Sequence, residues 1–282
     1  MKHLLLLVFS LPFLTFSQND LLDEIDTDSI PVDFASAAFK GLKIVNFEST
    51  KLVSKDELTF VVSHRFGSLE NGIDTFFGLD EAVTRLNFIY GITDGFNVGL
   101  SRSSFAKIYE ASVKYRIVRQ KKNEFPVTIV GYHSALINTA LEKVDFPRLE
   151  FKERLGYTTQ LLISRKINTD LSIEFAPTFF HDNLVSINEQ NNSQFALGFG
   201  GRYKLTKRWS INADYGLHLN RAENSIFRNP VSIGFDLETG GHVFQLHFTN
   251  AQAMNANTFL GQTTGDWTDG DVFFGFNLSR TF

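Results

Sequence analysis

The chain has 282 residues, with 27 Lys and Arg against 31 Asp and Glu, and its formal net charge of −4 gives no reason to expect nucleic acid as a partner. It contains no cysteine, which excludes disulfide scaffolds, thiolate metal sites and a lipid-modified N-terminal cysteine. Phe occurs 30 times, which indicates either a very large core or a surface that does not face water.

Residues 1–17 have the parts of a secretory signal peptide. Lys2 and His3 precede the apolar run "LLLLVFSLPFL", and "TFS" then places small residues before a cleavage after Ser17. The run is too short for the roughly 20 residues that cross a bilayer as a helix. We therefore expect the mature chain to be exported.

Residues 18–55 differ from the rest of the chain. The stretch "NDLLDEIDTDSIPVD" carries six acidic residues and no basic one, as is typical of a solvated linker. The short apolar piece "AAFKGLKIVNFES" follows it. Residues 43–49 could form one more strand, but that strand would make the total odd, so we assign them to a periplasmic or lumen-side appendage. The placement of residues 40–50 stays open.

From about residue 56 onward, apolar and polar residues alternate with the period of a β-strand. In "YEASVKYRI", for example, Tyr109 and Val113 alternate with Glu110 and Lys114. There are twelve such stretches of roughly 9–13 residues, which exceed the 5–6 residues of soluble strands and fit the 9–11 residues of tilted membrane strands. The sequence predicts an all-β fold, a transmembrane up-and-down antiparallel β-barrel of about 12 strands over residues 56–282.

Short and long connections alternate between these stretches. Short turns are expected at 93–95, 119–124, 166–170, 206–208 and 239–241, and longer links at 67–82, 139–150, 181–192, 220–229 and 251–270. Outer-membrane barrels have short periplasmic turns and longer outer loops. This alternation predicts that both ends of the barrel domain lie on the periplasmic side.

Several stretches resemble an outer-membrane β-barrel family of Bacteroidetes-type bacteria, a domain of unknown function. They are "SHRFG" (63–67), "GLSRSS" (99–104), "GGRYKLTKRWSINADYG" (200–216), "ETGGHVFQLHFTNA" (238–251) and "FGFNLSRTF" (274–282). The resemblance covers about residues 40–282 and implies a barrel in the outer membrane of a Gram-negative cell, without an activity.

The last strand also resembles the insertion signal that the barrel-assembly machinery reads. Its apolar positions are matched by Phe274, Phe276, Leu278 and Phe282. Arg280 departs from the pattern at the third position from the end. The resemblance therefore implies the assembly machinery as a partner, together with outer-membrane lipid.

The polar face of the strands is rich in small residues and in charges of both signs, which suits a crowded, water-lined interior. The candidate lumen charges are Arg65, Arg85, Lys114, Arg116, Arg154, Arg202, Asp214, His218 and Asp236. Glu110, Glu174 and His247 share this face. The basic members could guide a small anionic solute, or bases and acids could pair across the barrel and plug it.

Three functions follow from this pattern. The first is a narrow, porin-like channel for small solutes, with anions favoured by the basic residues, and the second is a plugged barrel with a structural or docking role. The third, an outer-membrane lipid hydrolase, has less support because the chain lacks a G-x-S-x-G motif.

His242 and His247 are five residues apart and so lie on opposite strand faces, which argues against a shared metal. We expect no enzyme activity, no metal and no cofactor.

Overall fold

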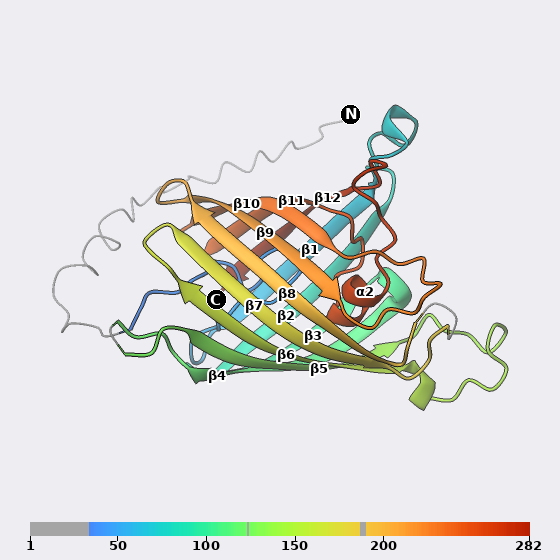
Figure 1. The fold of residues 1–282 in the computed structure, drawn as a ribbon, viewed down its shortest axis with the longest axis horizontal. Coiled ribbons are helices and arrows are strands. Elements are labelled where there is room, and N and C mark those ends of the chain that lie inside the picture. The colour runs from blue at the N-terminus through green and yellow to red at the C-terminus, as the bar shows by residue number, and fades with distance from the viewer. Residues whose placement is uncertain (1–33, 123, 187–189) are drawn as a thin grey trace, which may run out of the picture. The chain divides into compact units, whose positions relative to one another are not determined.

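Antiparallel strands make up most of the chain, and they close into a barrel (Figure 1). The computed structural model describes residues 34–122, 124–186 and 190–282, and the expected signal peptide lies outside these ranges. Within the described residues there are twelve strands, each paired with its neighbours in chain order, and β1 pairs with β12. The strands are β1 (Leu58–Ser68), β2 (Ala82–Thr93), β3 (Phe96–Ser103), β4 (Ile108–Val118), β5 (Thr128–Asn138), β6 (Leu155–Lys166), β7 (Leu171–Asp182), β8 (Ser193–Lys204), β9 (Trp209–His218), β10 (Val231–Thr239), β11 (His242–Thr249) and β12 (Phe273–Thr281). The predicted up-and-down barrel of twelve strands is confirmed.

Each strand has one apolar outer face and one polar inner face, because successive side chains of a strand point to opposite sides of the sheet. On β8, Phe195 and Phe199 are 48% and 44% exposed, whereas Gln194 and Arg202 on the opposite face are 1% and 7% exposed. The same alternation of exposed apolar and buried polar residues recurs around the barrel. The period-2 pattern of the sequence therefore sets which side chains face the lumen.

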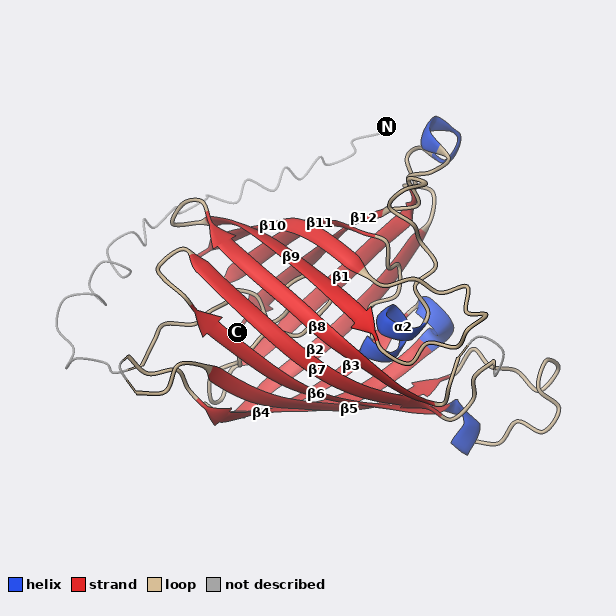
Figure 2. Cartoon of the chain, viewed as in Figure 1, coloured by secondary structure: helices blue, strands red, loops and turns tan. Residues whose placement is uncertain are grey.

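The two ends of the barrel differ in the length of their connections, as expected. One end carries the short turns between β2 and β3, β6 and β7, β8 and β9, and β10 and β11, and also the chain end at Phe282. The other end carries the longer loops and also the short link between β3 and β4, and Figure 2 shows that the helices lie at that end. These are η1 (Gly72–Thr75), η2 (Phe105–Lys107), η3 (Lys152–Arg154) and α2 (Ala256–Gly261). Among the described residues, no helix is long and apolar enough to cross a membrane.

Two stretches of chain are buried although they belong to no strand. Residues 38–53, here called the inner segment, precede β1 and are almost entirely buried. Residues 251–263, here called the inner loop, connect β11 to β12, contain α2 and are buried to a similar degree. Both fill the interior of the barrel, so residues 40–50, which the sequence leaves unplaced, lie inside the wall.

The last residues of the chain complete the seam between β12 and β1. The backbone N–H of Phe282 donates to the carbonyl of Leu58 (2.9 Å), and the N–H of Leu58 donates back to Phe282 (3.2 Å). Phe274, Phe276 and Leu278 lie on the outer face, and Phe282 is 64% exposed. The Arg280 guanidinium lies 4.7 Å from the centre of the Phe282 ring, a cation–π contact at the edge of the barrel.

Candidate functional site

The lumen is the candidate site, and the inner segment makes a tight turn in it. The N–H of Ile44 donates to the Phe47 carbonyl (2.9 Å), and the N–H of Ser49 donates to the Leu42 carbonyl (2.9 Å). This folding brings three successive N–H groups to one side, an arrangement that forms an anion-binding concavity. The ligand here is a carboxylate of the barrel wall.

Asp214 of β9 is that carboxylate. Its Oδ2 accepts the N–H groups of Val45 (3.0 Å), Asn46 (2.7 Å) and Phe47 (3.0 Å). Asp214 is 3% exposed. A buried carboxylate needs such donors, and the buried N–H groups of the turn need an acceptor, so each satisfies the other. Asp214 therefore acts as the anchor for the tip of the inner segment.

The side chain of Asn46 extends this anchor to other strands. Its Nδ2 donates to the hydroxyls of Ser232 (2.9 Å) and Thr249 (3.0 Å) on β10 and β11. Its Oδ1 accepts from Arg65 of β1 (3.2 Å). On β12, Asn277 donates to the Val45 carbonyl (3.3 Å). The turn is thus bound to the wall on several sides.

A buried ionic cluster holds the flank of the turn. Glu48 pairs with Lys43 of the inner segment (2.9 Å) and with Lys114 of β4 (3.2 Å). Burial by itself raises the pKa of Glu48, but the two ammonium groups outweigh it and hold the pKa at about 2. Glu48 is therefore charged at neutral pH, and Lys114 faces the inner segment and not an open path.

The end of the inner segment is fixed by polar residues of β3, β6 and β7. The N–H of Thr50 donates to Glu174 Oε2 (3.0 Å), and its hydroxyl contacts the Ser164 hydroxyl (2.5 Å). Further along, Val53 and the amide of Asn97 exchange two hydrogen bonds of 2.8 and 2.9 Å. Side chains of the predicted lumen face therefore bind backbone groups of this segment.

The inner loop is held in a similar way at the long-loop end. Arg85 of β2 pairs with Glu110 of β4 (2.5 Å) and also donates to the Met254 carbonyl (3.2 Å). Asn255 donates to the other oxygen of Glu110 (2.9 Å). Asn257 donates to Asp182 Oδ1 (2.9 Å) at the end of β7. Arg85 and Glu110 thus form a base–acid pair within the wall, and the same pair also binds the inner loop.

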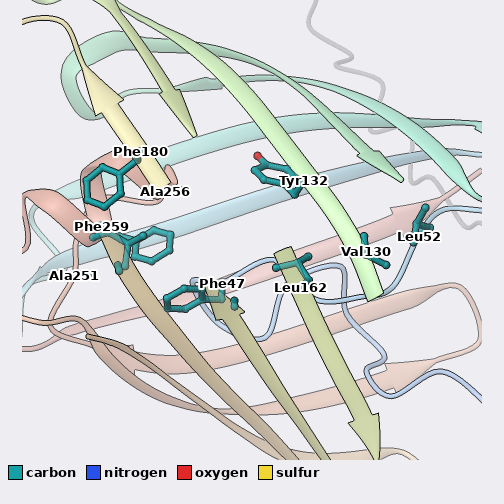
Figure 3. Close-up of a cluster of buried hydrophobic side chains, with 12 residues drawn as sticks. Phe47, Leu52, Val130, Tyr132, Leu162, Phe180, Ala251, Ala256 and Phe259 are labelled. Atoms are coloured by element: carbon teal, nitrogen blue, oxygen red, sulfur yellow. The ribbon is translucent and has the colours of Figure 1, made fainter. Parts of the chain in front are cut away.

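The two inserted stretches meet in the middle of the barrel. The ring of Phe47 lies edge-on to the ring of Phe259, with centroids 5.1 Å apart. Figure 3 shows this contact within a cluster of apolar side chains from the inner segment, the wall and the inner loop. The cluster comprises Phe47, Leu52, Val130, Tyr132, Leu162, Ala176, Phe180, Ala196, Ala251, Ala256, Phe259 and Leu260. The centre of the lumen is therefore an apolar core and not a water-lined path.

Little free space remains beside the turn. Two cavities between the inner segment and the wall, one near Arg85 and one near Lys114, each have a volume of about 10 Å³. A space of that size holds about one water molecule. Larger cavities, of about 220 and 340 Å³, lie where the chain enters at the short-turn end.

Among the described residues, the other predicted lumen residues form no hydrogen bond with the inner segment. Arg202 donates to Ser210 (3.1 Å), Asp236 accepts from Gln245 (2.9 Å), and His218 contacts Gln194 (2.9 Å). All three are buried on the inner face. Arg116 is only half-buried, at the short-turn mouth.

Arg154 lies just outside β6, the strand that the sequence predicts for it. It lies in η3, before β6 begins at Leu155, and donates to the Asn138 carbonyl (3.3 Å). The sequence "ERLGYTTQLLIS" reads as one strand from Glu153, but a 3₁₀ turn interrupts the alternation at its start. Arg154 therefore belongs to the long-loop end of the barrel and not to the strands that form the wall.

Several histidines form cross-strand pairs with hydroxyl groups. His64 contacts Thr84 (2.9 Å), His133 contacts Thr159 (3.0 Å), and His181 contacts Ser193 (2.9 Å). Within the described ranges none of these histidines has a carboxylate partner to orient it, as a hydrolytic triad would require. In the same ranges no group of three or more His, Cys, Asp or Glu could hold a metal ion.

The sequence did not identify the inner segment as the partner of the lumen charges. One local pattern could have indicated it. Gly198 and Gly200 occupy inward positions of β8, where a methyl group would overlap Phe47 and Ile44 respectively. Glycine at successive inward positions indicates close approach by another part of the chain.

Comparisons with known proteins agree with a membrane barrel. A family model described as "Membrane bound beta barrel domain (DUF5777)" matches residues 39–282, so the match includes nearly all of the inner segment. No curated protein sequence matches the chain.

Among solved structures, the chain is similar to two porins and an outer membrane channel. A NanC porin is 10% identical, with a TM-score of 0.48 over 80% of this chain and 98% of that one. A KdgM porin in complex with disordered oligogalacturonate is 10% identical, with a TM-score of 0.49 over 80% and 99%. The COG4313 outer membrane channel from Pseudomonas putida F1 is 13% identical, with a TM-score of 0.48 over 82% and 97%. Similarity at this level carries no information about activity.

Proposed function

Because the chain belongs to a family of membrane-bound β-barrel domains (DUF5777), we propose that it is an outer-membrane barrel that its own inner segment and inner loop keep closed. Its role is then structural or docking, as in the second function expected from the sequence. The chain is exported by its signal peptide, cleaved after Ser17, and the short-turn end with Phe282 faces the periplasm. Two features support this placement: the turns at that end are short, as periplasmic turns of outer-membrane barrels are, and the outer face carries an apolar band with aromatic residues.

One observation carries the proposal of a closed barrel. The tip of the inner segment is anchored to Asp214 by three N–H groups and packs against Phe259 of the inner loop. The spaces beside it hold about one water molecule each, at about 10 Å³. A hydrated ion does not fit such spaces, so passage requires the inserted stretches to move.

Planar-bilayer recording tests this proposal. The full-length protein should be electrically silent. A variant that lacks residues 38–53, with residues 251–263 replaced by a Gly-Ser linker, should give stepwise currents. Folding of each protein is checked by its altered gel migration before boiling. Currents of the same size from the full-length protein would contradict the proposal.

A second function, passage of small anionic solutes after the inner segment moves, has one observation in its favour. Arg65 and Lys114 bind the inner segment and not the acids of neighbouring strands. Once the segment leaves, both cations would face the lumen together with Asp214 and Glu174, which also lose their contacts to the segment. Anions are then favoured where the field of the two cations outweighs that of the two acids. In the shortened variant described above, Arg65→Gln should then lower the preference for chloride over potassium.

Insertion by the barrel-assembly machinery is part of the proposal, with Phe274, Phe276, Leu278 and Phe282 as the signal. Deleting Phe282 should lower the yield of folded barrel in the outer-membrane fraction, because it removes both an aromatic anchor and the last hydrogen bonds to Leu58. Thr281→Ser serves as the control, since it keeps the chain length and the hydroxyl that contacts Thr59. Equal yields of folded barrel would refute this role for Phe282.

The proposal assigns no catalytic activity to the chain. The histidine–hydroxyl pairs of the outer face support this, because they join neighbouring strands and no acid of the described residues orients them. Release of fatty acid from phospholipid by the purified barrel, lost in Ser193→Ala, would overturn it.

A further inference from the structure

A cavity of about 340 Å³ lies at the short-turn mouth, between the inner segment and the ends of β4 and β5. Its polar lining comes from Ser36, Thr50, Lys51, Ser54, Asp94, Arg116, Arg119 and Thr128. Three of these side chains are cations and one is an acid. The cavity thus combines an excess of positive charge with several hydroxyl groups.

The neighbouring cavity at the same mouth does not share this excess. It has a volume of about 220 Å³, and its lining includes Lys40 and Lys51 but also Glu57 and Glu238. Lys40 and Glu238 form an ion pair of 2.7 Å. Acids and bases therefore balance in the cavity of about 220 Å³ and not in the cavity of about 340 Å³, although both border residues 51–53 of the inner segment.

Arg116 lines the unbalanced cavity. It faces the lumen from β4 and is half-buried. Within the described ranges its guanidinium takes part in no hydrogen bond and no ion pair, whereas Arg65, Arg85 and Arg202 on the same inner face all donate to side chains. A guanidinium carries five donors, and a partly buried one without acceptors is unfavourable.

Arg119 lies beside it with free donors of its own. Among the described residues its contact is with the ring of Phe34, 4.7 Å from the guanidinium carbon. A contact with a ring uses none of the guanidinium's N–H groups as conventional hydrogen-bond donors, so these stay available for an anion. The acid of this cavity, Asp94, accepts the N–H of Lys55 (3.0 Å) and does not bind either arginine.

We propose that this cavity binds a small oxyanion, such as phosphate or sulfate, between Arg116 and Arg119. Two guanidinium groups recognise an oxyanion through charge-assisted and bidentate hydrogen bonds. Lys51 adds charge, and the hydroxyls of Ser54 and Thr128 add donors. The same chemistry is present in free phosphate and in the phosphate of a lipid headgroup. The site belongs to the closed barrel and does not depend on solute passage.

Because residues 50–54 line the cavity, the bound anion would contact the inner segment as well as the wall. A ligand that binds the closed state stabilises it by mass action. The oxyanion should therefore raise the thermal stability of the barrel and slow the release of the inner segment.

The test is calorimetric titration of the full-length protein in a non-ionic detergent with inorganic phosphate and with sulfate. Saturable binding is expected, together with a higher melting temperature. Arg116→Gln should weaken binding at least about tenfold, the loss of about 1.4 kcal/mol expected when a charge-assisted contact is removed. Arg102→Gln is the matched control, because Arg102 is exposed on the outer face, over the ring of Tyr109.

The outcomes separate the site from other sources of binding. Equal affinities of the Arg116→Gln and Arg102→Gln proteins, or no saturable binding of either anion, would overturn the proposal. If vesicles containing phosphatidylglycerol compete with free phosphate for the wild-type protein, the source is a lipid headgroup; if they do not, it is a soluble anion. The site rests on the closed state proposed above, but the two can fail separately: stepwise currents from the full-length protein would refute the closed state, whereas the titration of the Arg116→Gln protein reports on the anion contact with Arg116.

Discussion

Gly198→Val should raise the fraction of molecules in which the inner segment has left the lumen, while the barrel wall stays folded. Gly198 faces inward from β8, and a methyl group there would overlap the ring of Phe47. Phe47 is 2% exposed and already packed against Phe259, so it has little room to move aside. Overfilling a packed core costs about 1–3 kcal/mol. The segment can avoid this cost by leaving, whereas β8 is held by β7 and β9.

The measurement uses a single introduced thiol. Because the chain contains no cysteine, Ser49→Cys places a unique thiol in the inner segment at a fully buried position. Its reaction with a water-soluble maleimide should be slow in the parent and fast in the Gly198→Val protein. Gly201→Val is the control on the same strand, since a methyl group there would approach its nearest neighbour, the Ser172 carbonyl oxygen, at 3.9 Å. Equal labelling of the two variants would show that Phe47 does not hold the segment in place.

Asp214→Ala should release the tip of the same segment by removing its acceptor. Three buried N–H groups, those of Val45, Asn46 and Phe47, would lose their partner. Each unsatisfied group costs about 1–3 kcal/mol, so we expect a loss of at least about 3 kcal/mol for the closed state. That loss corresponds to an increase on the order of 100-fold in the open population, since each 1.4 kcal/mol is tenfold.

The rate at which the Ser49→Cys thiol reacts with maleimide measures this open population, provided that the inner segment opens and closes faster than the thiol reacts. Asp170→Ala is the control, because Asp170 is exposed in the turn between β6 and β7 and its hydrogen bonds to other described residues use only its backbone. Arg65 and Asn277 stay in place in both proteins. Labelling rates within a factor of about two of each other would contradict the anchoring role of Asp214.

The wall of the barrel was predictable because its information is local. In "YEASVKYRI" the alternation of Tyr109 and Val113 with Glu110 and Lys114 fixes which face is polar without reference to any other strand. The contrast between short turns such as 239–241 and long loops such as 251–270 then fixes the order of the strands. The alternation within strands and the lengths of the links between them can both be read from a single sequence, and the structure agrees with both.

The contents of the lumen were not predictable in the same way. The alternation of apolar and polar residues identified Asp214 and Lys114 as members of the inner, polar face. It did not identify their partners, which lie in a segment whose sequence does not alternate. The predicted strand starts two residues before β6, at Glu153, because a 3₁₀ turn can precede a strand without changing the residue pattern. The burial of the inner loop could not be predicted either, because its sequence resembles that of an ordinary polar loop. Asn255 and Asn257 are buried only because their acceptors lie on strands that are distant in the sequence.

The sequence distances spanned by the inner segment determine when it can be fixed during assembly. Thr50 contacts Glu174 across 124 positions, Val45 contacts Asp214 across 169, and Asn277 contacts Val45 across 232. Contacts between distant positions form late, because a long loop must be closed first. The segment precedes β1, yet the residues that hold it are complete only when β12 arrives. The inner segment can therefore be fully fixed only when the ring closes or afterwards, so a barrel that fails to close also lacks a fully anchored plug.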